Sequence, residues 1–279
     1  MSRPRLRESL THSPRDLRDL LARFGLEPRR ALGQNFVVDP NTVRRIAGLA
    51  EVGRGDHVVE IGAGLGSLTL ALAERGASVV AVEKDRDLVP ALREVIAAHD
   101  VRVVEGDARE LDWDVVLGDH DPWSLVANLP YNVATPLVLD LLRDVPRIES
   151  MLVMVQREAG ERLAAGPGTK AVGIPSMLVA YYGRARVVAQ VPASVFHPRP
   201  RVESVLVRIV RHDRAPVDTP IEVIDPVLRA AFGQRRKMLR RSLAGRVDAD
   251  GFEVADVDPR ARPETLDLAA WSRLAAQAR

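Results

Sequence analysis

The sequence has no cysteine, only 4% aromatic residues and no long apolar run. Without cysteine there can be no disulfide, thiolate nucleophile or cysteine-bound zinc. No stretch reaches the roughly 18 apolar residues that a membrane-spanning helix needs, and the first residues lack the apolar core of a secretory signal. The six histidines form neither a catalytic triad nor a metal-binding pattern. We therefore expect a cytoplasmic protein with no membrane association and no metal.

The composition is that of a globular protein, and its charge is unevenly distributed. The 279 residues are 46% hydrophobic and 28% charged, with a net charge of +2, which excludes a disordered chain. Residues 1–50 hold 10 arginines against 5 acidic residues, residues 51–200 have an acidic excess, and residues 201–279 hold 15 basic against 12 acidic residues. Basic ends around an acidic middle indicate a polyanionic partner, although an unevenly charged solvated surface would give the same pattern.

Alternating apolar runs and amphipathic segments predict an α/β fold. Strands are expected at 57–61, 78–83, 101–106, 124–128, 150–155, 184–191 and 203–210. Helices between most of them predict a doubly wound, mostly parallel sheet. After a Pro-rich linker, 224–243 and 264–278 are expected to be helical. The predicted organisation is an N-terminal arm and helix (1–26), a Rossmann-like domain (27–211) and a small C-terminal helical domain (212–279).

Two helix starts are predicted near the N-terminus. Ser13 followed by Pro14 is typical of a cap and first helical residue, and this helix is expected to reach about Phe24. Asn41 is expected to cap a second helix over 42–52. Residues 27–40 are interpreted as a loop between the two.

A glycine-rich turn and two acidic residues predict a nucleoside site. Gly62 and Gly64, followed by Gly66, lie after the first strand and before a helix, where backbone N–H groups can approach a ligand. Glu83 ends the second strand and suits ribose hydroxyls, while Asp107 follows the third and suits an adenine amino group. Each feature alone also fits a structural turn or a helix-capping carboxylate. The G-x-G-x-G spacing favours S-adenosylmethionine (SAM) over NAD.

The segment Asn128-Leu129-Pro130-Tyr131 after the fourth strand is more specific. An Asn oxygen and a backbone carbonyl, presented by a proline-fixed turn, can accept hydrogen bonds from an exocyclic amine and aim its lone pair at a methyl sulfonium. Tyr131 offers an aromatic face for an extruded base, and Phe196 could close the other face. The alternatives are an Asn-Pro turn with a core tyrosine, and a core phenylalanine.

Basic residues gather near the end of the chain. Five cations follow Gln234 within seven residues, on a segment expected to be helical, with Met238 and Leu239 facing the core. A solvated helix face is the alternative to an RNA-binding surface. The predicted RNA-binding residues here and in the loop after Phe196 are Arg199, Arg201, Arg235, Arg236, Lys237, Arg240 and Arg241.

Taken together, these motifs resemble those of the ribosomal RNA adenine N6-dimethyltransferases, and most nearly the bacterial small-subunit enzymes. The resemblance runs through LGQNF, VEIGAGLGSLT, AVEKD, GDA, NLPYNVATPL, FHPRPRVESVLV and FGQRRKMLRRSL, and covers nearly the whole chain after the first 25 residues. It implies a SAM-dependent enzyme that dimethylates two adjacent adenosines near the 3′ end of 16S rRNA, in the immature small subunit. Separately, we expect the protein to be a monomer.

The resemblance also implies roles for individual residues. Asn35 and Val37 would contact SAM together with Gly62, Glu83, Asp107 and Asn128. Asn128, Leu129 and Tyr131 would form the amine site, with Phe196 stacking opposite. The chain departs from the family pattern at Val37, where leucine is usual, and at Val172 and Pro175.

Three other functions share some of these sequence features. An antibiotic-resistance methylase of large-subunit rRNA shares the chemistry, but NLPY and QRRKMLRRSL favour the small-subunit enzyme. A ribosome-assembly factor using the fold only for binding is opposed by the intact Gly62, Glu83 and Asn128. An NAD dehydrogenase is disfavoured by the glycine spacing and by NLPY.

Overall fold

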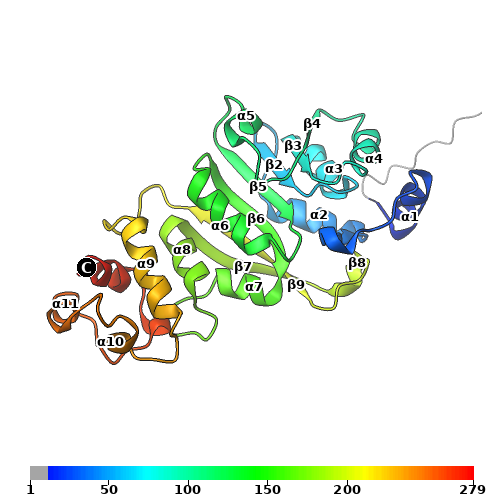
Figure 1. The fold of residues 1–279 in the computed structure, drawn as a ribbon. Coiled ribbons are helices and arrows are strands. Elements are labelled where there is room, and N and C mark those ends of the chain that lie inside the picture. Colours follow the sequence, from blue (N-terminus) through cyan, green and yellow to red (C-terminus); the bar gives the residue numbers. More distant parts are fainter. Residues whose placement is uncertain (1–11) are drawn as a thin grey trace, which may run out of the picture.

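The computed structural model describes residues 12–279, and its centre is a seven-stranded sheet (Figure 1). The strands lie in the order β4-β3-β2-β5-β6-β9-β7. The first five in this order run parallel, whereas β9 is antiparallel to both of its neighbours. Their bounds are β2 His57–Ile61, β3 Ser78–Glu83, β4 Val101–Glu105, β5 Trp123–Asn128, β6 Ile148–Gln156, β7 Gly183–Val191 and β9 Ser204–Arg211. The predicted α/β class with a mostly parallel sheet is confirmed.

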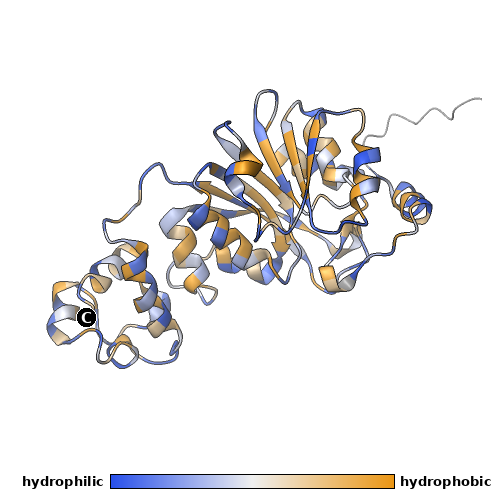
Figure 2. Ribbon diagram, turned by 45° about the horizontal axis from the view of Figure 1, so that its top comes forward, coloured by the Kyte–Doolittle hydropathy of each residue, from blue (hydrophilic) through white to orange (hydrophobic). Residues whose placement is uncertain are grey.

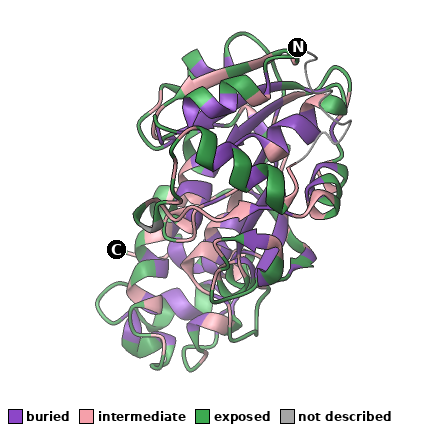
Figure 3. Ribbon diagram, turned by 90° about the vertical axis from the view of Figure 1, so that its right-hand side faces the viewer, coloured by how far each residue is buried: buried purple, intermediate pink, exposed green. Residues whose placement is uncertain are grey.

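Helices cover both faces of the central strands of this sheet. On one face, α2 and α3 pack through residues such as Ile46 and Leu72 against Val58 of β2. On the other, α6 and its neighbours pack through residues such as Val138 against Val207 of β9. Because both faces are covered, the central strands read as continuous apolar runs, and Figure 3 shows them buried between helices with exposed outer surfaces. The bounds are α2 Pro40–Leu49, α3 Ser67–Glu74, α4 Val89–Val95, α5 Trp113–Leu117, α6 Ala134–Asp144, α7 Arg157–Leu163 and α8 Ile174–Tyr182.

The first helix, α1 (Pro14–Arg23), begins as predicted. Ser13 and Asp16 form a capping box, and Pro14 takes the first turn. The predicted cap of α2 is wrong: Asp39, not Asn41, accepts from the Thr42 amide, at 2.9 Å. Pro40 explains the earlier start, since a proline suits the first helical position and lacks the N–H that needs a cap. The predicted arm of residues 1–26 lies partly outside the described residues, which begin at 12.

The residues after β9 form helices around a second apolar cluster, at the lower left of Figures 1 and 2. The fully buried Trp271 of α12 belongs to this cluster. The bounds are α9 Ile221–Phe232, α10 Leu239–Ser242, α11 Ala249–Val254 and α12 Leu268–Ala275. Val172 and Met177, from before and within α8, pack into the same cluster. The division at residue 212 stays a prediction.

The expected long helix over 224–243 is wrong. Helix α9 ends at Phe232, residues 233–238 turn, and α10 is only four residues long. Backbone hydrogen bonds from Leu239 to the Ala261 carbonyl and from Arg240 to the Pro259 carbonyl, both 2.9 Å, hold the chain in this bent path. Leu239 is fully buried as expected, but Met238 is 41% exposed, because it lies in the extended residue before α10 rather than on a continuous helix face.

Four elements had no counterpart in the predicted pattern: α5, α8, α11 and a two-stranded ladder. In this ladder β1 (Phe36–Val37) pairs antiparallel with β8 (Phe196–His197). Pro175 lies in the first turn of α8, where a proline is tolerated. Val172 is buried in the C-terminal apolar cluster. The fold therefore accommodates the departures from the family pattern at residues 172 and 175. Across residues 12–279, no helix combines the length and apolar character needed to cross a bilayer.

Candidate active site

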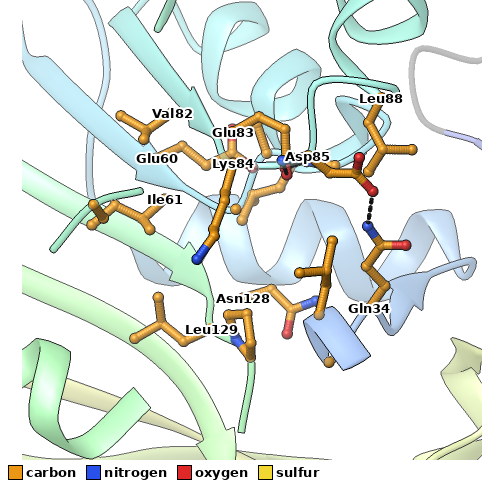
Figure 4. A pocket seen from close by; sticks show the side chains of 18 of the residues that line it. Gln34, Glu60, Ile61, Val82, Glu83, Lys84, Asp85, Leu88, Asn128 and Leu129 are labelled. Atoms are coloured by element: carbon orange, nitrogen blue, oxygen red, sulfur yellow. Dashed lines mark hydrogen bonds between the residues drawn. The ribbon is translucent and has the colours of Figure 1, made fainter. Parts of the chain in front are cut away.

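A pocket opens at the carboxyl ends of β2, β3 and β5, where their loops meet residues 32–37 (Figure 4). The chain winds in opposite directions from β2 toward β3 and toward β5, and such a switch point is where open α/β sheets bind ligands. The predicted SAM-site residues all line it: Asn35, Val37, Gly62, Gly64, Glu83, Asp107 and Asn128. Leu129, Pro130 and Tyr131 line it too. One pocket thus gathers five segments that are distant in sequence.

The glycine-rich turn after β2 lines this pocket. Gly64 has φ +58°, a conformation that favours glycine. A Cβ there would lie 3.0 Å from the Phe36 ring. The Gly64 amide donates to a Glu83 carboxylate oxygen at 2.7 Å. The turn therefore needs glycine both for its backbone and for the close approach of the 32–37 loop.

Glu83 ends β3 with its carboxylate held between two backbone amides. One oxygen accepts from Gly64 and the other from Asp85, at 2.8 Å. Burial raises the pKa of this carboxyl, and these amides oppose the rise. Each oxygen keeps a further lone pair for a ligand. The group is thus oriented as an acceptor at the pocket, as a ribose-binding carboxylate would need to be.

Asp107, after β4, is paired with two cations. Arg109 donates to it at 2.7 Å and Lys84 at 2.6 Å. The hydrogen bond from Arg109, reinforced by Lys84, holds the pKa of this carboxyl well below its usual range. Sequence reasoning assigned Asp107 to an adenine amino group and did not foresee these ion pairs, which a ligand would have to share or displace.

The Asn128 side chain is fixed by the loop that carries Asn35. Its Nδ2 donates to the Asn35 carbonyl at 2.9 Å, and the Asn35 side-chain amide donates in turn to the Gly33 carbonyl at 3.0 Å. With its nitrogen engaged, Asn128 is left to present Oδ1 as an acceptor. A Cβ on Gly33 would lie 3.0 Å from the Pro130 side chain, so the two segments are closely packed. The arrangement yields an oriented carbonyl-type acceptor at the end of β5.

The neighbours of Asn128 have distinct surroundings. Tyr131 is half-buried, and its hydroxyl lies 2.7 Å from that of Ser204 at the start of β9. Burial raises the pKa of this phenol. Leu129 is buried in the apolar core, so a role in the pocket falls to its backbone. The Tyr131 side chain is therefore held at its hydroxyl end, and the residue lines the pocket.

Phe196 lies elsewhere. It is 4% exposed, packs in the apolar cluster beneath α2 and α3, and pairs with Val37 through the β1–β8 ladder. It is not among the residues that line the pocket. Its part in base stacking stays a prediction, and in this structure the side chain belongs to the core.

Sequence reasoning missed two groups at the pocket. Glu60 on β2 is 2% exposed, accepts from the Thr69 hydroxyl at 2.5 Å, and has its pKa raised to about 8 by burial, with Glu83 adding to the rise. Gln34 donates to Asp85 at 2.7 Å and ties the 32–37 loop to the end of β3 (Figure 4). Both lie inside motifs already singled out, beside Gly62 and Asn35, and that adjacency was the available signal.

The predicted RNA-binding residues lie outside the pocket. Most are exposed, on the loop before β9 and around α10: Arg199, Arg201, Arg236, Lys237, Arg240 and Arg241. Arg235 differs, because it donates to the Lys170 carbonyl at 2.7 Å and lies 3.7 Å from Glu264. Arg235 thereby joins the C-terminal helices to the segment before α8.

Comparison with known proteins adds to this geometry. The family model described as ribosomal RNA adenine dimethylase matches residues 25–276. A protein of Thermobifida fusca named ribosomal RNA small subunit methyltransferase A is 47% identical over 274 residues, which cover 94% of each chain. One of the same name from Nocardia farcinica is 47% identical over 286 residues, covering 95% of this chain and 94% of its own.

Two solved structures share the fold. A dimethyladenosine transferase from Plasmodium falciparum aligns with TM-score 0.74 at 23% identity, over 86% of this chain and 98% of its own. The 23S rRNA methyltransferase ErmE aligns with TM-score 0.69 at 24% identity, over 87% of this chain and 98% of its own. At these identities, the likeness concerns the fold alone.

Proposed function

Because the chain belongs to the ribosomal RNA adenine dimethylase family, we propose that it dimethylates N6 of two adjacent adenosines in the 3′-terminal hairpin loop of 16S rRNA. The predicted enzyme class and cofactor are confirmed: the protein is a SAM-dependent rRNA adenine dimethyltransferase. The choice of small-subunit rRNA is supported by the relatives that are 42–47% identical, whose names specify the small ribosomal subunit.

The pocket fits SAM by its backbone turn and its polar groups. Gly62 and Gly64 bring main chain rather than side chains to the pocket, and Glu83 offers an oriented acceptor for ribose hydroxyls. Asp107 lies beyond it, at the end of β4, where it would accept from the adenine amino group. SAM supplies the methyl group on a sulfonium, so alignment is the main task left to the protein.

Asn128 carries the proposal for the reacting amine. Its nitrogen is occupied by the Asn35 carbonyl, so Oδ1 is the atom offered to an N–H of the adenine amine. Such an acceptor, with a neighbouring backbone carbonyl, holds the amine lone pair out of conjugation and toward the methyl group. Tyr131, anchored by Ser204, presents a ring face on which the extruded base can stack.

The substrate's surroundings are part of the proposal. We propose that the RNA is met within the immature small subunit, that the protein acts as a monomer, and that it works in the cytoplasm, where bacterial ribosomes are made. Exposed arginines on the loop before β9 and around α10 support contact with RNA phosphates.

The test is methyl transfer from labelled SAM to three substrates in parallel. These are small subunits that lack the terminal dimethyladenosines, protein-free large-subunit RNA, and duplex DNA. We expect N6,N6-dimethyladenosine in the small subunit alone. Label in large-subunit RNA would instead assign the protein to the resistance methylases, and bound SAM with no transfer to any substrate would support an assembly factor.

A further inference from the structure

A second concave surface lies at the far end of the sheet, away from the pocket. Strands β7 and β9 form it with the first residues that follow β9. Its lining includes five arginines and a single acidic residue, Asp213. The arginines are Arg184, Arg186, Arg208, Arg211 and Arg214. We call this surface the arginine groove.

The sheet register gathers these cations on one face. Arg184 pairs with Val210 and Arg186 with Arg208 across the antiparallel ladder, so their side chains point the same way. The strand rise puts Arg184 and Arg186 about 6.6 Å apart. Helices α7 and α8 cover the opposite face, whereas Arg184, Arg186 and Val210 are exposed here.

Not all of the arginines in the groove have partners. Arg208 pairs with Glu51 and donates to the Leu49 carbonyl. Arg211 donates to carbonyls at the end of α6, including that of Leu142 at 2.8 Å. Within residues 12–279, no ion pair involves Arg184, Arg186 or Arg214.

Like charges opposite each other destabilise a ladder, as Arg186 and Arg208 do here. Charges on an edge strand such as β7 also prevent pairing with other chains, and either sign would serve that purpose. The groove instead brings together positive charges from β7, from β9 and from the linker that follows β9. Guanidinium groups with no internal partner suit phosphate oxygens.

We infer that the arginine groove binds the phosphate backbone of the RNA substrate, at a place remote from the methylated base; this inference rests on the proposed function. Val210 lies six positions along β9 from Ser204, which contacts Tyr131 at the active site. At the strand rise this is roughly 20 Å. The groove therefore reaches RNA outside the loop that enters the pocket, and contributes to affinity rather than to the methyl-transfer step.

The test compares Arg184→Gln/Arg186→Gln with a matched control, Arg54→Gln/Arg93→Gln, which removes two exposed arginines elsewhere. Binding to small subunits and to protein-free 16S RNA is measured between 50 and 200 mM salt. Loss of two phosphate contacts makes the log–log slope shallower by about 1.8. The loss of RNA affinity relative to wild type should therefore be about tenfold smaller at 200 mM than at 50 mM salt. KM for subunits should rise, with kcat and SAM affinity unchanged.

Three results would overturn the inference. A slope equal to that of wild type would remove the groove from RNA binding. A change on intact subunits but not on protein-free RNA would assign the groove to a ribosomal protein. Aggregation with an unchanged slope would assign the arginines to protection of the sheet edge. If the wild type transferred no methyl group to small subunits, the proposed function would fail, while the slope comparison would still decide the role of the groove.

Discussion

Asn128 shows how a single amide can be committed to one orientation. Its nitrogen donates to a backbone carbonyl of a loop 93 residues away, and this leaves its oxygen for the substrate. The residue type could be recognised from NLPY, but the orientation could not, because the partner is a main-chain atom of Asn35 that the fold brings alongside.

Replacing Asn128 with alanine should lower kcat by about 10² to 10³, the usual loss when one preorganised hydrogen-bonding group is removed. SAM affinity should fall only in part, since Glu83 and the glycine turn are untouched. Steady-state methyl transfer and calorimetric SAM binding measure the two effects. Asn41→Ala removes an exposed amide and serves as the control. Turnover close to wild type in Asn128→Ala would refute the assignment.

Glu60 should make stability depend on pH. Burial raises its pKa to about 8 in the folded protein, against about 4.5 when unfolded, so the folded state holds an extra proton between these values. Below about pH 4.5, Glu60 has no such effect on the free energy of unfolding. As the pH rises from there toward 8, Glu60 lowers this free energy progressively. Glu60→Gln, which resembles the protonated side chain, should flatten this decline in urea unfolding at pH 5.5, 6.5 and 7.5.

Glu161→Gln, at an exposed site, is the control and should leave the decline as in the wild type. A Glu60→Gln profile parallel to wild type would show that another group is responsible.

Among the elements, the turn between β2 and α3 depends on glycine for two separate reasons. Gly64 combines a positive φ with contact to Phe36, whereas Gly118 has φ +64° and open space within 4 Å of where a Cβ would stand. The pair separates backbone strain from crowding. Both the turn and the 32–37 loop shape the pocket, so crowding at Gly64 is transmitted to the SAM site.

Gly64→Ala and Gly118→Ala should each lower stability by about 1–3 kcal/mol, because a residue with a side chain is strained at a positive φ. Only Gly64→Ala should also weaken SAM binding, by tenfold or more, because its methyl group displaces Phe36. Thermal unfolding and calorimetric titration distinguish the two effects. Equal SAM affinity in both variants would mean that the turn tolerates the methyl group.

The segment after α9 shows tertiary structure overriding helix propensity. Residues 234–243 are rich in arginine, leucine and lysine, which favour helix, yet the chain turns before α10. The bonds from Leu239 and Arg240 to the 259–261 segment cause this difference. Neither partner is close in sequence, so periodicity alone could not reveal it.

Across the protein as a whole, the apolar residues form separate clusters. One group flanks the sheet, and another lies among α8 to α12. We propose that residues 212–279 form a helical RNA-binding domain docked on α8, through Val172 and Met177. Arg235 reinforces this docking by its bond to Lys170, so it is better placed for structure than for RNA.

Changing Arg236, Arg240 and Arg241 together to glutamine should make the salt dependence of RNA binding shallower, by about 2.7 in log–log slope for three lost phosphate contacts. Binding to 16S RNA across a salt series measures it. Arg235→Gln should instead lower thermal stability and leave the slope unchanged. If the triple variant keeps the wild-type slope, the basic run is only a solvated surface.

Local patterns along the chain were enough to predict the α/β class, the positions of the seven strands of the main sheet and several of the residues that line the pocket. Strands that are buried on both faces appear as continuous apolar runs, and the turns after them contain glycine. Both are short-range features of the sequence, so they can be recognised before the fold is known. The orientation of Asn128, the ion pairs of Asp107, the burial of Phe196, the bend before α10 and the gathering of arginines on β7 and β9 emerged only from the folded chain. Each of these depends on partners distant in sequence, whose contacts outweigh local preference.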